Sequence, residues 1–206
     1  MQKINQKAEY EVIKNKLRKN QKDWIEYFNN PKLVKSKVKM ISAADIYLAT
    51  KEADEKLLAS LRNDINRSWI VTSTQIKYKE NLETEITHDK DSKVVAQKTI
   101  NAKVPVYPGT KLTENEETEK YMQALFDTKD SLKEIITTLN KLGENKPIYL
   151  WTPSQSYRND NPIRAVWLFF VDSDFVVSGN DWVGGGSGLS RGVRVSSAKQ
   201  NEAKKC

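Results

Sequence analysis

The first thirty residues carry apolar side chains at roughly helical spacing, separated by lysine, arginine, glutamine and asparagine. Ile4, Leu17 and Trp24 belong to this series, which an Asn-Asn-Pro sequence ends. The spacing therefore predicts a helix over residues 1–30. The four lysines between residues 31 and 40 predict a solvated continuation of this arm, and a nucleic-acid contact through them is an open alternative.

The middle of the chain alternates between helical and strand patterns. Ser42, followed by Asp45, imitates a capping box at a helix start, and Ser131 marks a second N-terminus. Runs of β-branched and aromatic residues separate the helical regions. The expected helices are 43–50, 53–66, 114–126 and 131–142, and the expected strands are 69–78, 84–87 and 94–106.

From Pro147 onward the pattern changes to short strands and loops. Strand alternation places Trp167 and Phe169 on one face and Val166 and Leu168 on the other, and it leaves open which face packs the core. The strands predicted here are 148–152, 165–171, 175–178 and 193–195, with loops at 154–161 and 184–188 and a turn at 172–174. Helices combined with such a sheet predict an α+β fold.

Composition narrows the chemistry. The 206 residues carry a net charge of +7, one cysteine, Cys206, and one histidine, His88. This excludes an internal disulfide and a cysteine-based metal site, and it leaves His88 as the only base for Ser-His-Asp or Cys-His catalysis. Its Thr-His-Asp-Lys-Asp context predicts a solvated turn residue instead. We therefore expect no catalytic residues, no metal and no cofactor.

The N-terminus has no secretory signal pattern, and the sequence has no run of 18 apolar residues. We therefore expect synthesis in the cytoplasm without membrane insertion. Association with a virion or a cell surface is left open.

A compositional break separates residues 147–198 from the rest of the chain. The protein contains 27 lysines and 15 glutamates, yet these 52 residues contain no lysine, glutamate or methionine, while four arginines remain. Strands and tight loops disfavour lysine and glutamate, which explains a deficit. Recognition surfaces are also poor in these residues and rich in tyrosine, tryptophan, arginine, serine, glycine and asparagine, which favours a binding surface here.

Three segments of this region follow one another in a recognisable order. They are Tyr-Leu-Trp-Thr-Pro-Ser at 149–154, a strand, turn and strand at 164–177, and a segment containing Arg-Gly-Val-Arg at 188–195. This order resembles the C-terminal half of C-type-lectin-fold variable proteins diversified by retroelements, which are related to the formylglycine-generating-enzyme fold. Segments 44–49, 57–62 and 69–74 resemble archaeal and archaeal-virus members more loosely.

The resemblance implies a C-type-lectin-like domain over residues 42–198, in which helices flank a small, mostly antiparallel, irregular sheet. Its variable, ligand-binding region is expected at about 151–195. A basic helical arm, residues 1–41, precedes the domain, and a disordered tail, residues 199–206, follows it.

The resemblance also offers a second explanation for the missing residues. Retroelements of this family mutate adenines in codons of the AAY type, and such codons can never become lysine, glutamate, methionine, glutamine or tryptophan codons. Trp151, Trp167 and Trp182 would then be fixed scaffold positions. Chemistry of the formylglycine-generating kind needs an internal cysteine pair, which one terminal cysteine cannot supply.

We therefore expect a protein that binds a protein or cell-surface ligand through a hypervariable surface, as a monomer or small homo-oligomer. The expected ligand contacts are Ser156, Tyr157, Arg158, Asp160, Asp172, Asp174, Ser178, Asn180, Trp182, Val183, Gly184, Gly185 and Ser187. The alternatives are a virion or fibre protein anchored by the basic helix, a calcium-dependent carbohydrate-binding lectin using Asn180 and Asp181, and a hydrolase using Asp172 and Asp174.

Overall fold

The computed structural model describes residues 10–11, 17–35, 37–52, 55–105, 109–153 and 162–195. The helices are α1 (Gln21–Phe28), α2 (Ala43–Glu52), α3 (Glu55–Arg67), α4 (Glu116–Phe126) and α5 (Leu132–Gly143), with a short 3-10 turn at Glu80–Leu82. The strands are β1 (Tyr10–Glu11), β2 (Val38–Met40), β3 (Ile70–Tyr78), β4 (Glu83–His88), β5 (Lys98–Lys103), β6 (Thr110–Lys111), β7 (Ile148–Trp151), β8 (Ile163–Val171), β9 (Asp174–Trp182) and β10 (Gly192–Arg194).

The strands form two sheets, and the architecture is α+β as the sequence predicts. The larger sheet has seven strands in the order β5-β4-β3-β8-β9-β7-β6, and only the β7–β9 pair is parallel. The smaller sheet has the order β1-β10-β2, so its central strand comes from the C-terminal end of the described chain. Within the described ranges, no helix is long and apolar enough to cross a membrane.

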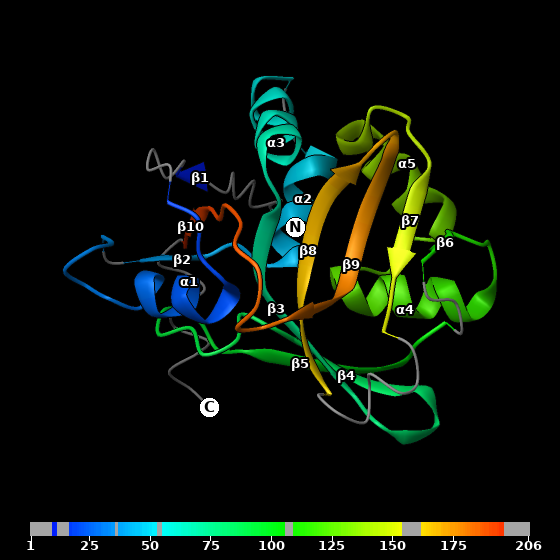
Figure 1. The fold of residues 1–206 in the computed structure, drawn as a ribbon, viewed down its shortest axis with the longest axis horizontal. Coiled ribbons are helices and arrows are strands. Elements are labelled where there is room, and N and C mark those ends of the chain that lie inside the picture. Colours follow the sequence, from blue (N-terminus) through cyan, green and yellow to red (C-terminus); the bar gives the residue numbers. More distant parts are fainter. Residues whose placement is uncertain are drawn as a thin grey trace, which may run out of the picture.

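Both faces of the larger sheet are packed. On one face Val166 and Leu168 join a core with residues of α2, α3, α4 and α5, and on the other Trp167 and Phe169 join a second core with α1 and β2. Figure 1 shows α1 and β2 on the left of the sheet and α4 and α5 on the right. Alternate side chains of β8 therefore pack into two different cores, and neither face of β8 is exposed to bind a ligand.

The predicted helices of the middle region and the strands at 69–78 and 84–87 are confirmed in kind and, within a few residues, in position, whereas the strand predicted over 94–106 spans only 98–103. The capping box at Ser131 is present, because its hydroxyl accepts from Glu134 N while the Glu134 carboxylate accepts from Ser131 N. β4 and β5 pair antiparallel around the loop of residues 89–97, as the predicted hairpin requires. β8 and β9 form the second predicted hairpin, turning at Asp172 and Ser173.

The helix predicted over residues 1–30 is wrong in extent. Tyr10 and Glu11 are a strand paired with β10, and the helix begins only after Asn20, whose side chain accepts from Asp23 N at 2.8 Å. An asparagine cap of this kind starts a new helix and interrupts a preceding one. α1 and β2 also pack on the rest of the chain, since Trp24 is only 1% exposed and Val38 only 2%.

His88 is buried, which corrects the prediction of a solvated turn histidine. Of the four lysines predicted to be solvated between residues 31 and 40, Lys32, Lys35 and Lys37 are exposed and Lys39 is buried. His88 is 3% exposed, and Lys39 forms ion pairs with Asp45 and Asp89 inside the protein. Burial disfavours the Lys39 ammonium, but its two carboxylate partners outweigh burial and raise its pKa. The Lys39 pairs connect β2, the start of α2 and the loop after β4.

Candidate functional site

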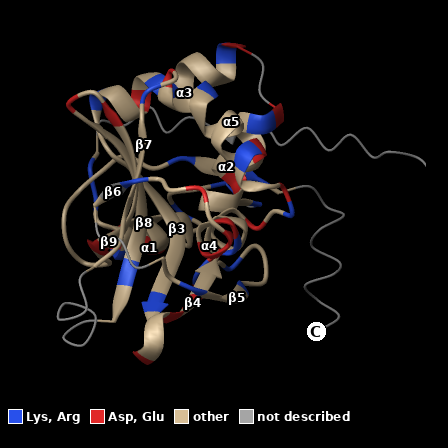
Figure 2. Ribbon diagram, turned by 90° about the vertical axis from the view of Figure 1, so that its right-hand side faces the viewer, with Lys and Arg blue, Asp and Glu red and all other residues tan. Residues whose placement is uncertain are grey.

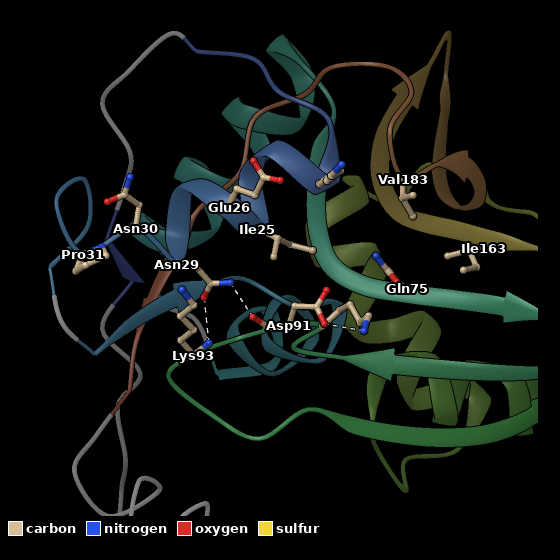
Figure 3. Close-up of a pocket in the computed structure, with 12 residues that line it drawn as sticks. Ile25, Glu26, Asn29, Asn30, Pro31, Gln75, Asp91, Lys93, Ile163 and Val183 are labelled. Atoms are coloured by element: carbon tan, nitrogen blue, oxygen red, sulfur yellow. Dashed lines mark hydrogen bonds and ion pairs between the residues drawn. The ribbon is translucent and has the colours of Figure 1, made fainter.

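A groove of about 730 Å³ lies between α1 and the loop that joins β4 to β5 (Figure 3). This volume is in the range of small-ligand pockets. Its lining residues come from α1, the turn after it, β3, the β4–β5 loop, β8 and the turn after β9. They are Lys22, Ile25, Glu26, Asn29, Asn30, Pro31, Gln75, Lys90, Asp91, Lys93, Ile163 and Val183.

One wall is a stripe of α1 whose members are three, four and seven residues apart. Lys22, Ile25, Glu26 and Asn29 follow this spacing, so they share one face of the helix. The opposite face fixes the helix in place, because Trp24 is buried and its Nε1 donates to Gly188 O at 2.8 Å. The wall is therefore held against the core.

Gln21 anchors α1 to β3 through the backbone. Its side-chain nitrogen donates to Thr72 O and Thr74 O, both at 2.7 Å, and its oxygen accepts from Gln75 Nε2 at 2.9 Å. The β3–β8 register shifts between Val71 and Gln75, so this part of β3 lacks regular ladder partners. The Gln21 amide satisfies the carbonyls there and places Gln75 in the groove.

The other wall is the loop after β4, and α1 holds it directly. Asn29 Nδ2 donates to Asp91 O at 2.7 Å, and Lys93 N donates to Asn29 Oδ1 at 3.0 Å (Figure 3). Asp89 and Asp91 both have a φ of 54°, in the left-handed region. Asp tolerates that region better than most residues, which suits this sharp loop.

The groove has apolar surface and a positive rim. Ile25, Ile163 and Val183 provide aliphatic contacts, while the rim carries three lysines against two carboxylates. Lys90 is neutralised by Asp91, with 2.7 Å between Nζ and Oδ1. The other two lysines, Lys22 and Lys93, form no ion pair with any residue that the structure describes.

Several predicted contact residues lie beside this groove, at the end of β9. Trp182 is 53% exposed, and the Arg164 guanidinium lies 5.4 Å from its ring centroid. The remaining predicted residues at this end are Asn180, which is exposed, Val183, which lines the groove, and Gly184, Gly185 and Ser187 in the turn that follows. The predicted segment and the groove thus meet at Val183.

Other predicted residues lie elsewhere. Ser156, Tyr157, Arg158 and Asp160 fall outside the described residues. Asp172 and Asp174 lie at the opposite end of the β8–β9 hairpin, about 26 Å from Trp182 at the usual strand rise.

Ser178 is fully buried, so a direct ligand contact is contradicted. Its hydroxyl donates to Asp181 Oδ2 at 2.8 Å and accepts from Asn180 N at 3.2 Å. Burial raises the pKa of Asp181 above its usual value, against the effects of the Ser178 hydrogen bond and the nearby Arg164 charge. The buried Ser178 hydroxyl thus binds Asp181 and Asn180 at the end of β9.

The glycine run after β9 has mixed roles. A Cβ on Gly186 would lie 3.0 Å from the buried Trp167 ring, and Gly186 has a φ of 61°. A Cβ on Gly188 would lie 2.5 Å from Trp69 O, whereas one on Gly184 meets nothing within 4 Å. Gly186 and Gly188 therefore lie against the Trp167 ring, where a side chain would not fit, whereas Gly184 has room for one.

The calcium and hydrolase alternatives gain no support from the geometry. Asn180 and Asp181 lie at one end of β9 and Asp172 and Asp174 at the other, so they cannot share an ion. Among the described residues, no group of three or more His, Cys, Asp and Glu side chains could hold a metal.

Arg191 and Arg194 of the Arg-Gly-Val-Arg segment differ in their surroundings. Arg191 is buried, and its Nε donates to Asp64 Oδ2 at 2.6 Å while Nη2 donates to Ser60 O at 2.7 Å. It thereby joins β10 to α3, whereas Arg194 is exposed. The sequence pattern singled out this segment, and the structure assigns its first arginine to the scaffold.

Most of the groove lies outside the residues that the sequence predicts as a binding site. Its walls come from α1 and the β4–β5 loop, for which the sequence pattern predicts an arm and a turn. The available signal was the α1 stripe beginning at Lys22, in which charged, apolar and amide side chains recur at helical spacing. That stripe alone does not reveal which loop faces it.

Comparison with known protein families, curated proteins and solved structures finds no match for this chain. The site therefore rests on its own geometry.

Proposed function

We propose that this protein is a ligand-binding protein whose recognition surface combines the groove with the exposed residues at the end of β9. The observation that carries the proposal is their junction at Val183, where a groove of about 730 Å³ meets the segment that composition favours for binding. An exposed tryptophan beside the groove, Trp182, adds a rigid aromatic contact of the kind common at binding hot spots.

The chemistry of the lining favours binding over catalysis. It consists of lysines, carboxylates, amides and aliphatic side chains, which suit ion pairing, hydrogen bonding and apolar contact. Nucleophilic catalysis needs a nucleophile within hydrogen-bond reach of a base, and these side chains offer no such pair with a hydroxyl, thiol or imidazole.

The finer proposal is a C-type-lectin-fold variable protein that a retroelement diversifies. The sequence resemblance supports it, and the exposed positions agree with it in kind. Asn180, Gly184 and Ser187 are residue types that mutated AAY codons reach, while Trp151, Trp167 and Trp182 are a type they cannot reach. Figure 2 shows β7 and β9 largely without charged residues, whereas α3 and α4 carry many.

The experiment for a display surface is a substitution-tolerance measurement on the full chain. Asn180→Tyr, Gly184→Ser and Ser187→Tyr, each made as a single variant, should each keep the Tm within about 2 °C, because an exposed substitution changes stability by about 0.5 kcal/mol or less. The matched control is Ser178→Asn, at a buried position of β9, which should lower Tm by several degrees. Single variants as unstable as the control would contradict a display surface.

The retroelement part has its own test. Sequencing around the gene should find a reverse-transcriptase gene and a near-repeat of its 3′ end. If both are missing, the protein is not diversified in this way, and the binding proposal then rests on the groove alone.

A further inference from the structure

The two lysines without ion pairs lie toward opposite ends of the groove. Lys22 N donates to Val183 O at 3.1 Å, which fixes Lys22 at the Val183 end. Lys93 N donates to Asn29 Oδ1, which fixes Lys93 at the other end. Lys22 and Asn29 are seven residues apart on α1, so the two ends are separated by about 10 Å along the helix axis.

The same two lysines also lie on opposite walls. Lys22 belongs to α1. Lys93 belongs to the β4–β5 loop, which lies across the groove from α1 (Figure 3). The third lysine of the rim, Lys90, pairs with Asp91, so among the described residues that line the groove Lys22 and Lys93 offer positive charge to a ligand. Two anionic groups on a ligand would therefore meet Lys22 at one end and on one wall of the groove, and Lys93 at the other end and on the opposite wall.

The middle of the groove suits an apolar group and backbone amides. Ile25 and Val183 supply aliphatic surface there, and Glu26 and Gln75 supply oxygen acceptors. Gln75 uses its nitrogen to donate to Gln21, which leaves its oxygen as an acceptor. Backbone N–H groups of an extended chain are the matching donors.

We infer that the groove binds an extended acidic peptide segment of a partner protein, with two carboxylates three residues apart. In an extended chain, residues three apart are about 10 Å apart and point to opposite sides. This spacing is close to the rise along α1 between Lys22 and Asn29, which binds Lys93 N, and the alternation matches the position of the two lysines on opposite walls. The two intervening residues are apolar and contact Ile25 and Val183. This inference names the ligand class of the proposed binding function and rests on it.

The test is fluorescence anisotropy with the full chain and a labelled, end-capped hexapeptide, Gly-Asp-Leu-Val-Asp-Gly. Replacing both aspartates by asparagine should weaken binding about tenfold, because two ion pairs are lost. Lys22→Gln and Lys93→Gln should each weaken binding of the acidic peptide about threefold and leave Tm unchanged. Lys133→Gln, an exposed lysine on α5, removes the same charge and should have no effect.

Several outcomes would overturn the inference. One is that the acidic peptide does not bind, and another is that it binds equally well to the Lys22→Gln and Lys93→Gln variants. Suberate, a linear dicarboxylate of similar length, must bind much more weakly than the peptide, since equal affinity would indicate a small-molecule site. Sedimentation that shows a dimer lost on Lys22→Gln would assign the groove to a second copy. Each of these leaves the substitution-tolerance result at Asn180, Gly184 and Ser187 standing, so the two proposals fail separately.

Discussion

His88 joins three elements through its two ring nitrogens. Its Nε2 lies 3.0 Å from Ala124 O and its Nδ1 lies 3.1 Å from Thr74 Oγ1, which in turn accepts from Ala43 N at 2.9 Å. A carbonyl only accepts, so Nε2 carries the proton and donates to it. Burial disfavours the charged imidazolium, and in the neutral ring Nδ1 accepts from the Thr74 hydroxyl. The neutral imidazole thus connects β3, β4 and the end of α4.

This arrangement predicts a loss of stability in mild acid. Burial lowers the pKa of His88 below its usual 6.5, although the Ala124 carbonyl raises it in part. The unfolded chain then binds more protons, so the contribution of His88 is complete above pH 6.5 and is lost as pH falls toward the folded pKa. The loss can reach about 1.4 kcal/mol per pH unit.

Urea unfolding of the wild type and His88→Gln at pH 7.5, 6.5, 5.5 and 5.0 measures this contribution. The difference in unfolding free energy between the two proteins should shrink as pH falls below 6.5. Parallel pH curves for the two proteins would show that His88 does not titrate with folding.

Gly188 predicts a second single-residue effect. A Cβ there would lie 2.5 Å from Trp69 O and 2.8 Å from Val71 Cγ2, closer than real contacts allow. Gly188→Ala should therefore reduce the unfolding free energy by about 1–3 kcal/mol, as overpacking does. Gly184→Ala is the matched control and should change it by less than about 0.5 kcal/mol, because nothing lies within 4 Å. Equal effects at the two glycines would contradict the packing described for this turn.

At the scale of elements, α1 depends on the two β3 carbonyls that Gln21 satisfies. Gln21→Leu keeps the side-chain volume but leaves Thr72 O and Thr74 O without this donor. Unsatisfied buried groups cost about 1–3 kcal/mol each, so we expect a loss of about 2–4 kcal/mol in chemical unfolding. The control Gln97→Leu is exposed and should stay within about 0.5 kcal/mol. A Gln21→Leu variant as stable as this control would show that α1 is not held through β3.

The sequence predicted those elements whose signals are local. The Ser131 cap, the apolar face of α5 and the turn at Asp172 each lie within a few residues of the structure they specify. Where the signal is not local, the prediction failed. Residues 38–40 form a strand because β10 lies beside them, 150 residues later in the chain, and no nearby residue indicates that partner.

The site residues also divide into those with a local signal and those without one. Trp182, which is exposed, and Gly184, which has space for a side chain, lie in the segment where composition predicted a binding surface. The groove, however, forms from segments that meet only in the fold, such as Lys22 of α1 and Lys93 of the β4–β5 loop. Ser178 was misassigned because strand alternation does not reveal that both faces of the sheet are packed here, so that residues 175–179 of β9 are all buried.

At the scale of the whole molecule, the beginning and end of the described chain form one unit. Lys19 and Gly188 exchange backbone hydrogen bonds at 3.2 and 3.0 Å, and Trp24 donates to Gly188 O. β10 lies between β1 and β2 (Figure 1). The groove borders on this junction where Lys22 N donates to Val183 O, so α1 and the turn after β9 shape it together. A change in α1 is therefore expected to alter the turn after β9.

The most direct test of a binding surface at this junction is a selection. A display library of the full chain is randomised at four groove and turn positions and selected against one immobilised protein target. The positions are Lys22, Glu26, Gly184 and Ser187. A control library is randomised at four exposed positions of α3, which are Lys56, Ala59, Asn63 and Asn66.

Both libraries should fold, because all eight positions lie on the surface. If the groove and the turn after β9 form the recognition surface, the first library yields binders with Kd in the micromolar range or tighter, and the α3 library yields none. Binders at equal frequency from the two libraries, or folded groove variants that never bind, would contradict the account.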